Sequence, residues 1–212
     1  MLKLYDFLLS GNCHKVRIML SLLQLDYELV AVNLQQGEHK SPEFLQINPL
    51  GQVPVLTDGN TVIWDSQAIL VYLARRYGGE QWFPTQAEAM SQVMQWLSVA
   101  SNEIQNSFAA ARRHYLFNAQ LDVTSAQQKA EQILYIFNEH LTKHDWLACQ
   151  LMSRRTPPRP LPCQRITIAD IACFPYIALA PEGNISLDAY PHVIAWIDRI
   201  KNLPGYVSMP GT

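Results

Sequence analysis

The order of strand-like and helix-like segments in the first third of the chain restricts the fold more than any other feature. Runs rich in apolar and β-branched residues are typical of strands, and apolar positions three and four residues apart are typical of helices. Strands are expected over residues 2–9, 27–34 and 53–64, and helices over residues 14–25 and 66–78. The turn Asp58-Gly59-Asn60 divides the last strand segment into two strands.

This order predicts a thioredoxin-like α/β domain over residues 1–77, because a strand, a crossover helix and a parallel strand are followed by a hairpin and a closing helix. Glycine and proline between residues 78 and 86 predict a linker. From residue 87 onward the periods are helical, so residues 87–212 are expected to form an all-helical bundle.

One long helix is expected to begin at Ala87. A stripe of residues at spacings of three and four is expected to lie on its buried face: Val93, Trp96, Leu97, Ala100, Ile104, Ser107, Phe108 and Ala111. Later helices are expected over residues 126–141 and 188–204. Thr167 and Asp170 have the spacing of a capping box, which predicts a helix start with no role in chemistry.

Composition restricts the partners of the chain. Of its 212 residues, 16 are Lys or Arg and 18 are Asp or Glu, so no basic surplus favours a nucleic-acid partner. The apolar runs are shorter than the roughly 20 residues that cross a bilayer, so no membrane span is expected. Because the first residues are typical of a strand and not of a signal peptide, a cytoplasmic protein is expected.

Cysteine and histidine spacing gives no sign of a metal site. The cysteines are expected to be reduced thiols: Cys13, Cys149, Cys163 and Cys173. His140 and His144 are expected on a solvated helix face near a helix end. Residues 149–165 hold four prolines and four arginines, which predicts a mobile loop. A basic docking loop, a poorly ordered insertion and a local reading-frame slip all remain open for that segment.

Three stretches converge in a thioredoxin-like fold, at residues 10–13, 52–54 and 65–67, and together they suit a small anionic peptide. Asp65 and Ser66 open a helix, whose free N–H groups can bind a carboxylate, and simple capping by either residue is a compatible alternative that these residues alone favour. Val53-Pro54 begins a strand. A cis bond there would turn the Val53 backbone groups toward a peptide ligand, so a cis bond is expected.

The short stretch "SGNCHK" raises the question of which group does chemistry. Ser10 ends a strand, where its hydroxyl and the N–H groups of the next helix can hold a thiolate and lower the pKa of its thiol. A simple helix cap is the alternative. Cys13 is expected to pack inward as a small apolar group, and His14 and Lys15 are expected to be solvated.

Four stretches, "SGNCHKVR", "EHKSPEFLQINPLGQVPVL", "DSQAILVYLARRY" and "ITIADIACFPY", together resemble the cytosolic glutathione transferases. The resemblance covers nearly the whole chain apart from residues 149–165, and the opening is similar to the theta and nu groups, in which Ser or Thr activates the thiol. It implies the transferase fold, glutathione as co-substrate without a metal, a homodimer and a role in detoxification.

The resemblance also implies roles for individual residues. They are Ser10 and Asn12 at the thiol, Val53 with Pro54 at the cysteinyl backbone, His39 and Gln52 at the glycine end, and Asp65 and Ser66 at the γ-glutamyl end. Asp65 is one methylene shorter than the family's usual Glu or Gln. In omega relatives Cys stands at the Ser10 position, so this chain keeps a resolving-type Cys13 without a first cysteine.

The expected activity is transfer of glutathione to a small electrophile, with an apolar wall supplied by the helical domain. Phe108, Arg112 and Tyr115 are the candidates for this wall, and core packing is the alternative for them. Two other functions remain open. One is glutathione-dependent disulfide reduction, and the other is a non-catalytic module that binds glutathione or a protein partner.

Overall fold

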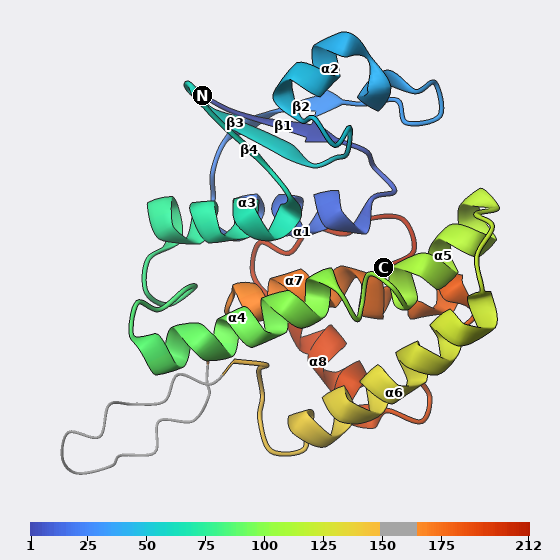
Figure 1. Ribbon diagram of the computed structural model, residues 1–212. Coiled ribbons are helices and arrows are strands. Elements are labelled where there is room, and N and C mark those ends of the chain that lie inside the picture. The colour runs from blue at the N-terminus through green and yellow to red at the C-terminus, as the bar shows by residue number, and fades with distance from the viewer. Residues whose placement is uncertain (149–164) are drawn as a thin grey trace.

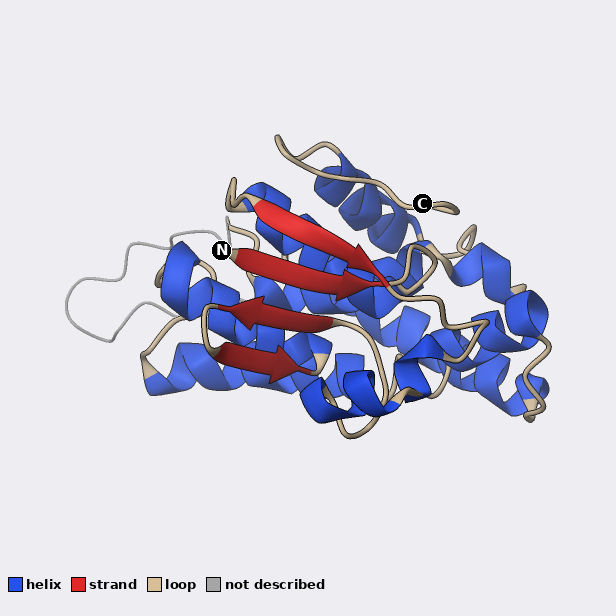
Figure 2. Ribbon diagram, turned by 90° about the horizontal axis from the view of Figure 1, so that it is seen from above, coloured by secondary structure: helices blue, strands red, loops and turns tan. Residues whose placement is uncertain are grey.

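Strand β1 lies inside a four-stranded sheet of order β2-β1-β3-β4 (Figure 2). The computed structural model describes residues 1–148 and 165–212. Its strands are β1 (Leu2–Asp6), β2 (Tyr27–Ala31), β3 (Val55–Asp58) and β4 (Thr61–Trp64). β2 is parallel to β1, whereas β3 is antiparallel to both of its neighbours. The predicted order of strands and helices is therefore confirmed, and with it the thioredoxin-like plan.

Helices cover both faces of this sheet (Figure 1). α1 (Gly11–Leu22) and α3 (Ser66–Leu73) lie between the sheet and the helical part, and α2 (Pro42–Ile47) lies on the other face. α2 was not predicted from the sequence, although its start carries a local signal: Ser41 accepts a hydrogen bond from the Phe44 N–H, and Pro42 takes the first helical position.

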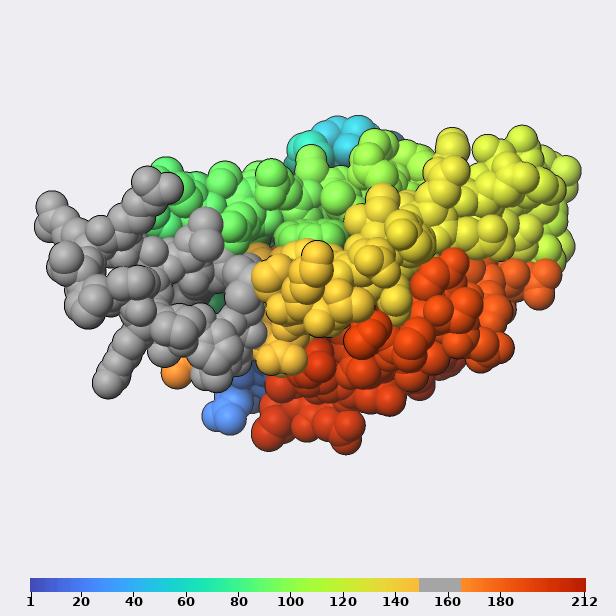
Figure 3. Space-filling model, turned by 90° about the horizontal axis from the view of Figure 1, so that it is seen from below, coloured from blue at the N-terminus to red at the C-terminus, as the bar shows by residue number. Residues whose placement is uncertain are grey.

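The helical part follows an irregular connection after α3. Its helices are α4 (Ala87–Ser101), α5 (Phe108–Phe117), α6 (Val123–Leu141), α7 (Ile168–Ala178) and α8 (Pro191–Lys201). Seen from the side opposite the sheet, α4, α6 and the C-terminal segment form adjoining bands of the surface (Figure 3). Among the described residues, no helix is long and apolar enough to cross a bilayer.

The expectation of one unbroken helix from Ala87 through Ala111 was wrong, because turns separate α4 from α5 at residues 102–107. Polar side chains there bond locally: the Asn106 amide donates to Asn102 at 2.9 Å, and the Ser107 hydroxyl donates to the Glu103 carbonyl at 2.5 Å. Such bonds compete with helical hydrogen bonding. The predicted stripe is nevertheless buried, with Trp96 half-buried.

Asp170 joins three parts of the helical core. Its carboxylate and Thr167 form the predicted capping box at the start of α7. The same carboxylate accepts hydrogen bonds from the Leu147 N–H at 2.9 Å and the Trp196 indole at 3.0 Å. Because all four residues are buried, the capping box also ties α7 to α8 and to the segment after α6.

Cys13 and Cys173 are free and buried. The predictions for Cys149, Cys163 and the loop over residues 149–165 fall outside the described residues, apart from exposed Arg165. Within the described ranges, no three histidine, cysteine or acidic side chains gather as metal ligands would.

Candidate active site between the sheet and the helical part

The N-termini of α1 and α3 open into one polar cavity of about 620 Å³. It is lined by Ser10, Asn12, Leu34, His39, Lys40, Gly51, Gln52, Val53, Asp65, Ser66, Gln67, Ser101, Gln105 and Arg113. Two helix starts at one cavity supply free N–H groups and positive dipole ends, which favour an anionic ligand. The structure thus brings together every residue predicted to bind glutathione except Pro54, which is buried directly beside Val53.

At the start of α3, Asp65 caps the helix, whereas the Ser66 hydroxyl does not; the sequence had left open which of the two is the cap. The Asp65 carboxylate caps the helix by accepting hydrogen bonds from the Gln67 N–H at 2.9 Å and the Ala68 N–H at 3.1 Å. Asp65 holds a φ of 76°, a conformation that non-glycine residues rarely adopt. The Ser66 hydroxyl lies 3.2 Å from the Gln67 side-chain oxygen and 3.4 Å from the Asn12 side-chain oxygen, so it also contacts α1.

The segment before β3 is shaped by side chains that bond its backbone. The Lys40 ammonium donates to the Leu50 and Gly51 carbonyls at 2.9 and 3.0 Å, and the Asn48 amide donates to the Gln52 carbonyl at 2.7 Å. The Val53-Pro54 bond is cis, as predicted. Nearby His39 is half-buried, and burial and the Lys40 charge lower its pKa.

Ser10 is the N-cap of α1, and its Oγ accepts a hydrogen bond from the Cys13 N–H at 3.2 Å. That bond uses a lone pair of the oxygen and leaves the hydroxyl proton available to a ligand. Ser10 lines the polar cavity and also a second, apolar cavity. A group bound at this hydroxyl therefore faces both spaces.

Cys13 lines neither of these two cavities and is fully buried, as predicted. Burial and the nearby Asp6 charge raise the pKa of its thiol to about 12, so the thiolate is disfavoured at neutral pH. Asp6 is itself buried in an ion pair with Arg17 at 2.5 Å. Cys13 thus has the environment of a core side chain and not of a reactive cysteine.

The expectation that His14 and Lys15 are solvated was wrong, since both are fully buried. His14 Nε2 lies 2.8 Å from the Val207 carbonyl oxygen, and burial lowers the pKa of the ring to about 4. The Lys15 ammonium has no hydrogen-bond partner among the described residues and lies 5.5 Å from the centroid of the Tyr176 ring. Burial lowers its pKa to about 8.

The second cavity, of about 290 Å³, lies between the loop after β1 and the helices α5 and α7. Its lining is mainly apolar: Phe7, Leu9, Ser10, Leu34, Gln35, Ala109, Arg112, Arg113, Phe117 and Tyr176. Of the three residues predicted for an electrophile wall, only Arg112 lines it. Phe108 is buried in the core, and Tyr115 is exposed and packs edge-on against His114.

Two buried side chains of the helical part support the turn that carries Ser10. Arg112 donates to the Leu9 carbonyl at 2.7 Å and pairs with Glu182. The Tyr176 ring packs so closely on Gly11 that a Cβ there would lie 2.8 Å from ring carbons. Position 11 therefore requires glycine for close approach.

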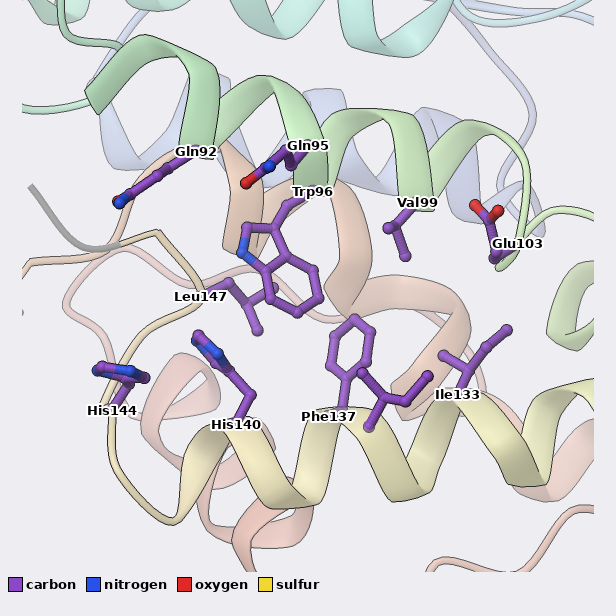
Figure 4. Close-up of a pocket in the computed structure, with 11 residues that line it drawn as sticks. Gln92, Gln95, Trp96, Val99, Glu103, Ile133, Phe137, His140, His144 and Leu147 are labelled. Carbon is purple, nitrogen blue, oxygen red and sulfur yellow. The ribbon is translucent and has the colours of Figure 1, made fainter. Parts of the chain in front are cut away.

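A third cavity, of about 440 Å³, lies between α4 and α6 and holds none of the predicted site residues (Figure 4). The Trp96 ring lies edge-on to Phe137 and His140, at centroid distances of 4.8 and 5.0 Å. His140 and His144 are half-buried, and their ring centroids lie 4.5 Å apart. The expectation of a solvated histidine face was therefore wrong.

Sequence reasoning missed several lining residues. Three of them lie in helical segments whose residue spacing indicated only a buried core: Arg113, Phe117 and Tyr176. Lys40 and Gly51 could have been predicted, because they lie in the stretch that leads into the Gln52-Val53-Pro54 motif, and that motif was assigned to the site.

Comparison with known proteins gives a consistent result. Residues 1–75 match the family model described as the glutathione S-transferase N-terminal domain. The chain is 46% identical over 206 residues to a zeta-class glutathione S-transferase of Euphorbia esula, covering 97% of this chain and 88% of that protein. It is 28% identical to the disulfide-bond oxidoreductase YfcG of Escherichia coli, covering 96% and 92%. A solved glutathione S-transferase structure from Pseudomonas fluorescens superimposes with a TM-score of 0.87 at 30% identity, covering 99% and 98%.

Proposed function

Because this chain belongs to the glutathione S-transferase family, we propose that it is a glutathione transferase in which Ser10 activates the thiol of glutathione for attack on a small electrophile. One observation carries the proposal: Ser10 lines both the polar and the apolar cavity. The peptide occupies the polar cavity, its sulfur lies at the Ser10 hydroxyl, and the electrophile approaches from the apolar side.

The roles of the binding residues follow from their chemistry. Ser66 and the N-terminus of α3 receive the γ-glutamyl carboxylate, and Asp65 faces the ammonium group beside it. His39 and Gln52 receive the glycine end, and the Val53 backbone pairs with the cysteinyl residue. Asn12 lies between the thiol and α3 because its side chain contacts Ser66.

The reaction needs a thiolate at neutral pH, whereas a free thiol has a pKa of about 8.5. A hydroxyl donor at Ser10 and the N-terminus of α1 both stabilise the anion and lower that pKa. Attack then forms a sulfur–carbon bond and expels the leaving group with its electron pair. No protein thiol is needed, which agrees with the buried state of Cys13.

Turnover of 1-chloro-2,4-dinitrobenzene with glutathione, measured beside reduction of a mixed disulfide of glutathione, tests the proposal. Conjugation faster than disulfide reduction supports it. The reverse result favours the reductase function, which the similarity to YfcG supports. Retention on immobilised glutathione with neither activity would favour a non-catalytic binding module.

We also propose a cytoplasmic homodimer that acts in detoxification. Exposed apolar side chains support the pairing: Val62 and Trp64 lie on edge strand β4, Met94 lies on α4, and Ile136 lies on α6 and lines the cavity between α4 and α6. In a two-fold dimer, the exposed side chains of β4 in one copy can cover those of the helices in the other copy. Sedimentation of the parent and of Ile136→Asp tests this: a dimer that Ile136→Asp weakens supports it, and a parent monomer contradicts it.

A further inference from the structure

Arg113 of α5 stands apart from the other charged groups around Ser10. It lines the polar and the apolar cavity, a position it shares only with Ser10 and Leu34 among the residues that line them. Its side chain is exposed, and among the described residues no carboxylate pairs with it and no hydrogen bond engages its guanidinium. It is therefore a charge at the boundary of two cavities that the protein itself does not neutralise.

Its neighbour Arg112 also lines the apolar cavity but differs from it in burial and in pairing. Arg112 is buried, pairs with Glu182 and donates to the Leu9 carbonyl, so its charge is compensated and its role is structural. Of the described residues that line the apolar cavity, none is acidic. The net charge presented to a ligand in that cavity is thus the positive charge of Arg113.

The carboxylates of glutathione do not account for Arg113. In the proposed function the γ-glutamyl carboxylate lies at the start of α3 and the glycine carboxylate lies near His39, both within the polar cavity. Arg113 instead lines both cavities. In the proposed function, the sulfur and the electrophile meet where these two cavities adjoin. A guanidinium in a partly apolar space binds a carboxylate with paired, charge-assisted hydrogen bonds.

We infer that Arg113 is a specificity-determining residue that selects electrophiles carrying a carboxylate on an apolar body. The inference rests on the proposed function and adds the substrate class. For an aryl halide of this kind, the thiolate sulfur bonds to the ring carbon, the carbon–chlorine bond breaks and chloride leaves with the electron pair. Arg113 contacts the carboxylate and takes no part in the bond changes.

The test compares 4-chloro-3,5-dinitrobenzoate with its neutral carboxamide analogue. Because the two compounds differ in intrinsic reactivity, the quantity of interest is the ratio of their kcat/KM values in each variant relative to the parent. Arg113→Gln should lower this ratio about tenfold by removing the charged hydrogen bonds, and Arg113→Lys should restore part of it. Arg76→Gln, which removes an exposed arginine outside both cavities, should leave the ratio unchanged.

Binding of the two glutathione conjugates by calorimetry gives a second readout that needs no turnover. Arg113→Gln should weaken binding of the carboxylate conjugate about tenfold and leave the carboxamide conjugate unchanged. Equal effects on both conjugates, or no effect on either, would overturn the inference. Failure of the parent to conjugate either compound would count against the proposed function alone, since the binding comparison still decides the role of Arg113.

Discussion

The two cavities that meet at Ser10 are built in different ways. Most of the polar cavity comes from short turns and helix starts, at residues 10–12, 39–40, 51–53 and 65–67. Most of the apolar cavity comes from side chains of the β1 loop, α5 and α7, which are far apart in sequence. The proposed glutathione site therefore depends on local backbone geometry, whereas the proposed electrophile site depends on how the helical part packs.

The largest effect is expected from Arg112→Met, which removes a side chain that supports the turn before Ser10, where the two cavities meet. The change leaves Glu182 without its cation and the Leu9 carbonyl without its donor, beside a buried core. Removing one partner of a buried ion pair costs about 3–5 kcal/mol, and the lower figure applies because Glu182 is partly exposed.

Urea unfolding measures this cost. The double variant Arg112→Met with Glu182→Gln should recover part of the loss, because no carboxylate is then left unpaired. A loss below about 0.5 kcal/mol in the single variant would show that Arg112 does not support the turn before Ser10.

A second prediction concerns Lys15, whose buried ammonium has no hydrogen-bond partner among the described residues. Its folded pKa of about 8 lies below the usual 10.5, so the unfolded chain binds more protons between these two pH values. Lys15→Met should therefore stabilise the fold by roughly 1–3 kcal/mol at pH 7. The gain should be full below pH 8 and should vanish as the pH rises toward 10.5.

Unfolding of the parent and Lys15→Met at several pH values checks this prediction. The difference between the two proteins isolates Lys15 from the other groups that titrate at high pH. Should Lys15→Met destabilise the fold at pH 7, the contact of the ammonium with the Tyr176 ring would outweigh its burial.

A smaller effect, confined to the polar cavity, is expected from Ser66→Ala. Loss of a donor to a carboxylate should raise the KM for glutathione about tenfold to a hundredfold, since such a bond contributes about 1.5–3 kcal/mol. Stability should change little because Asp65 and not Ser66 caps α3. Asp65→Ala is the matched control for capping and should cost about 1 kcal/mol in unfolding. A loss of stability in Ser66→Ala with an unchanged KM would contradict this division.

The same contrast explains which of the two cavities could be predicted from the sequence. Residues such as Pro54, Asp65 and Ser66 carry their signal in the neighbouring residues, so the polar cavity could be predicted. The apolar wall could not, because the turns at residues 102–107 separate α5 from α4, so residue spacing does not tell which face of α5 meets the cavity. Phe108, Arg112 and Tyr115 share one face of α5, whereas Ala109, Arg113 and Phe117 join Arg112 at the cavity.

Burial of His14 and Lys15 was also beyond the sequence. A polar side chain on an amphipathic helix is ordinarily solvated, and α1 is an exception because the sheet, α7 and the C-terminal segment enclose it. These contacts join residues almost two hundred positions apart, such as His14 and Val207. Only the packed tertiary structure shows them.

The most direct test of the account is the pH dependence of kcat/KM for conjugation by Ser10→Ala and Cys13→Ala. Ser10→Ala should lose about tenfold to a hundredfold at pH 7, and much of the rate should return at higher pH, where the thiolate forms without help. Cys13→Ala should match the parent throughout, since that thiol is buried and its pKa is about 12. Loss of activity in Cys13→Ala with a parent-like Ser10→Ala would contradict the account and make the cysteine the working group.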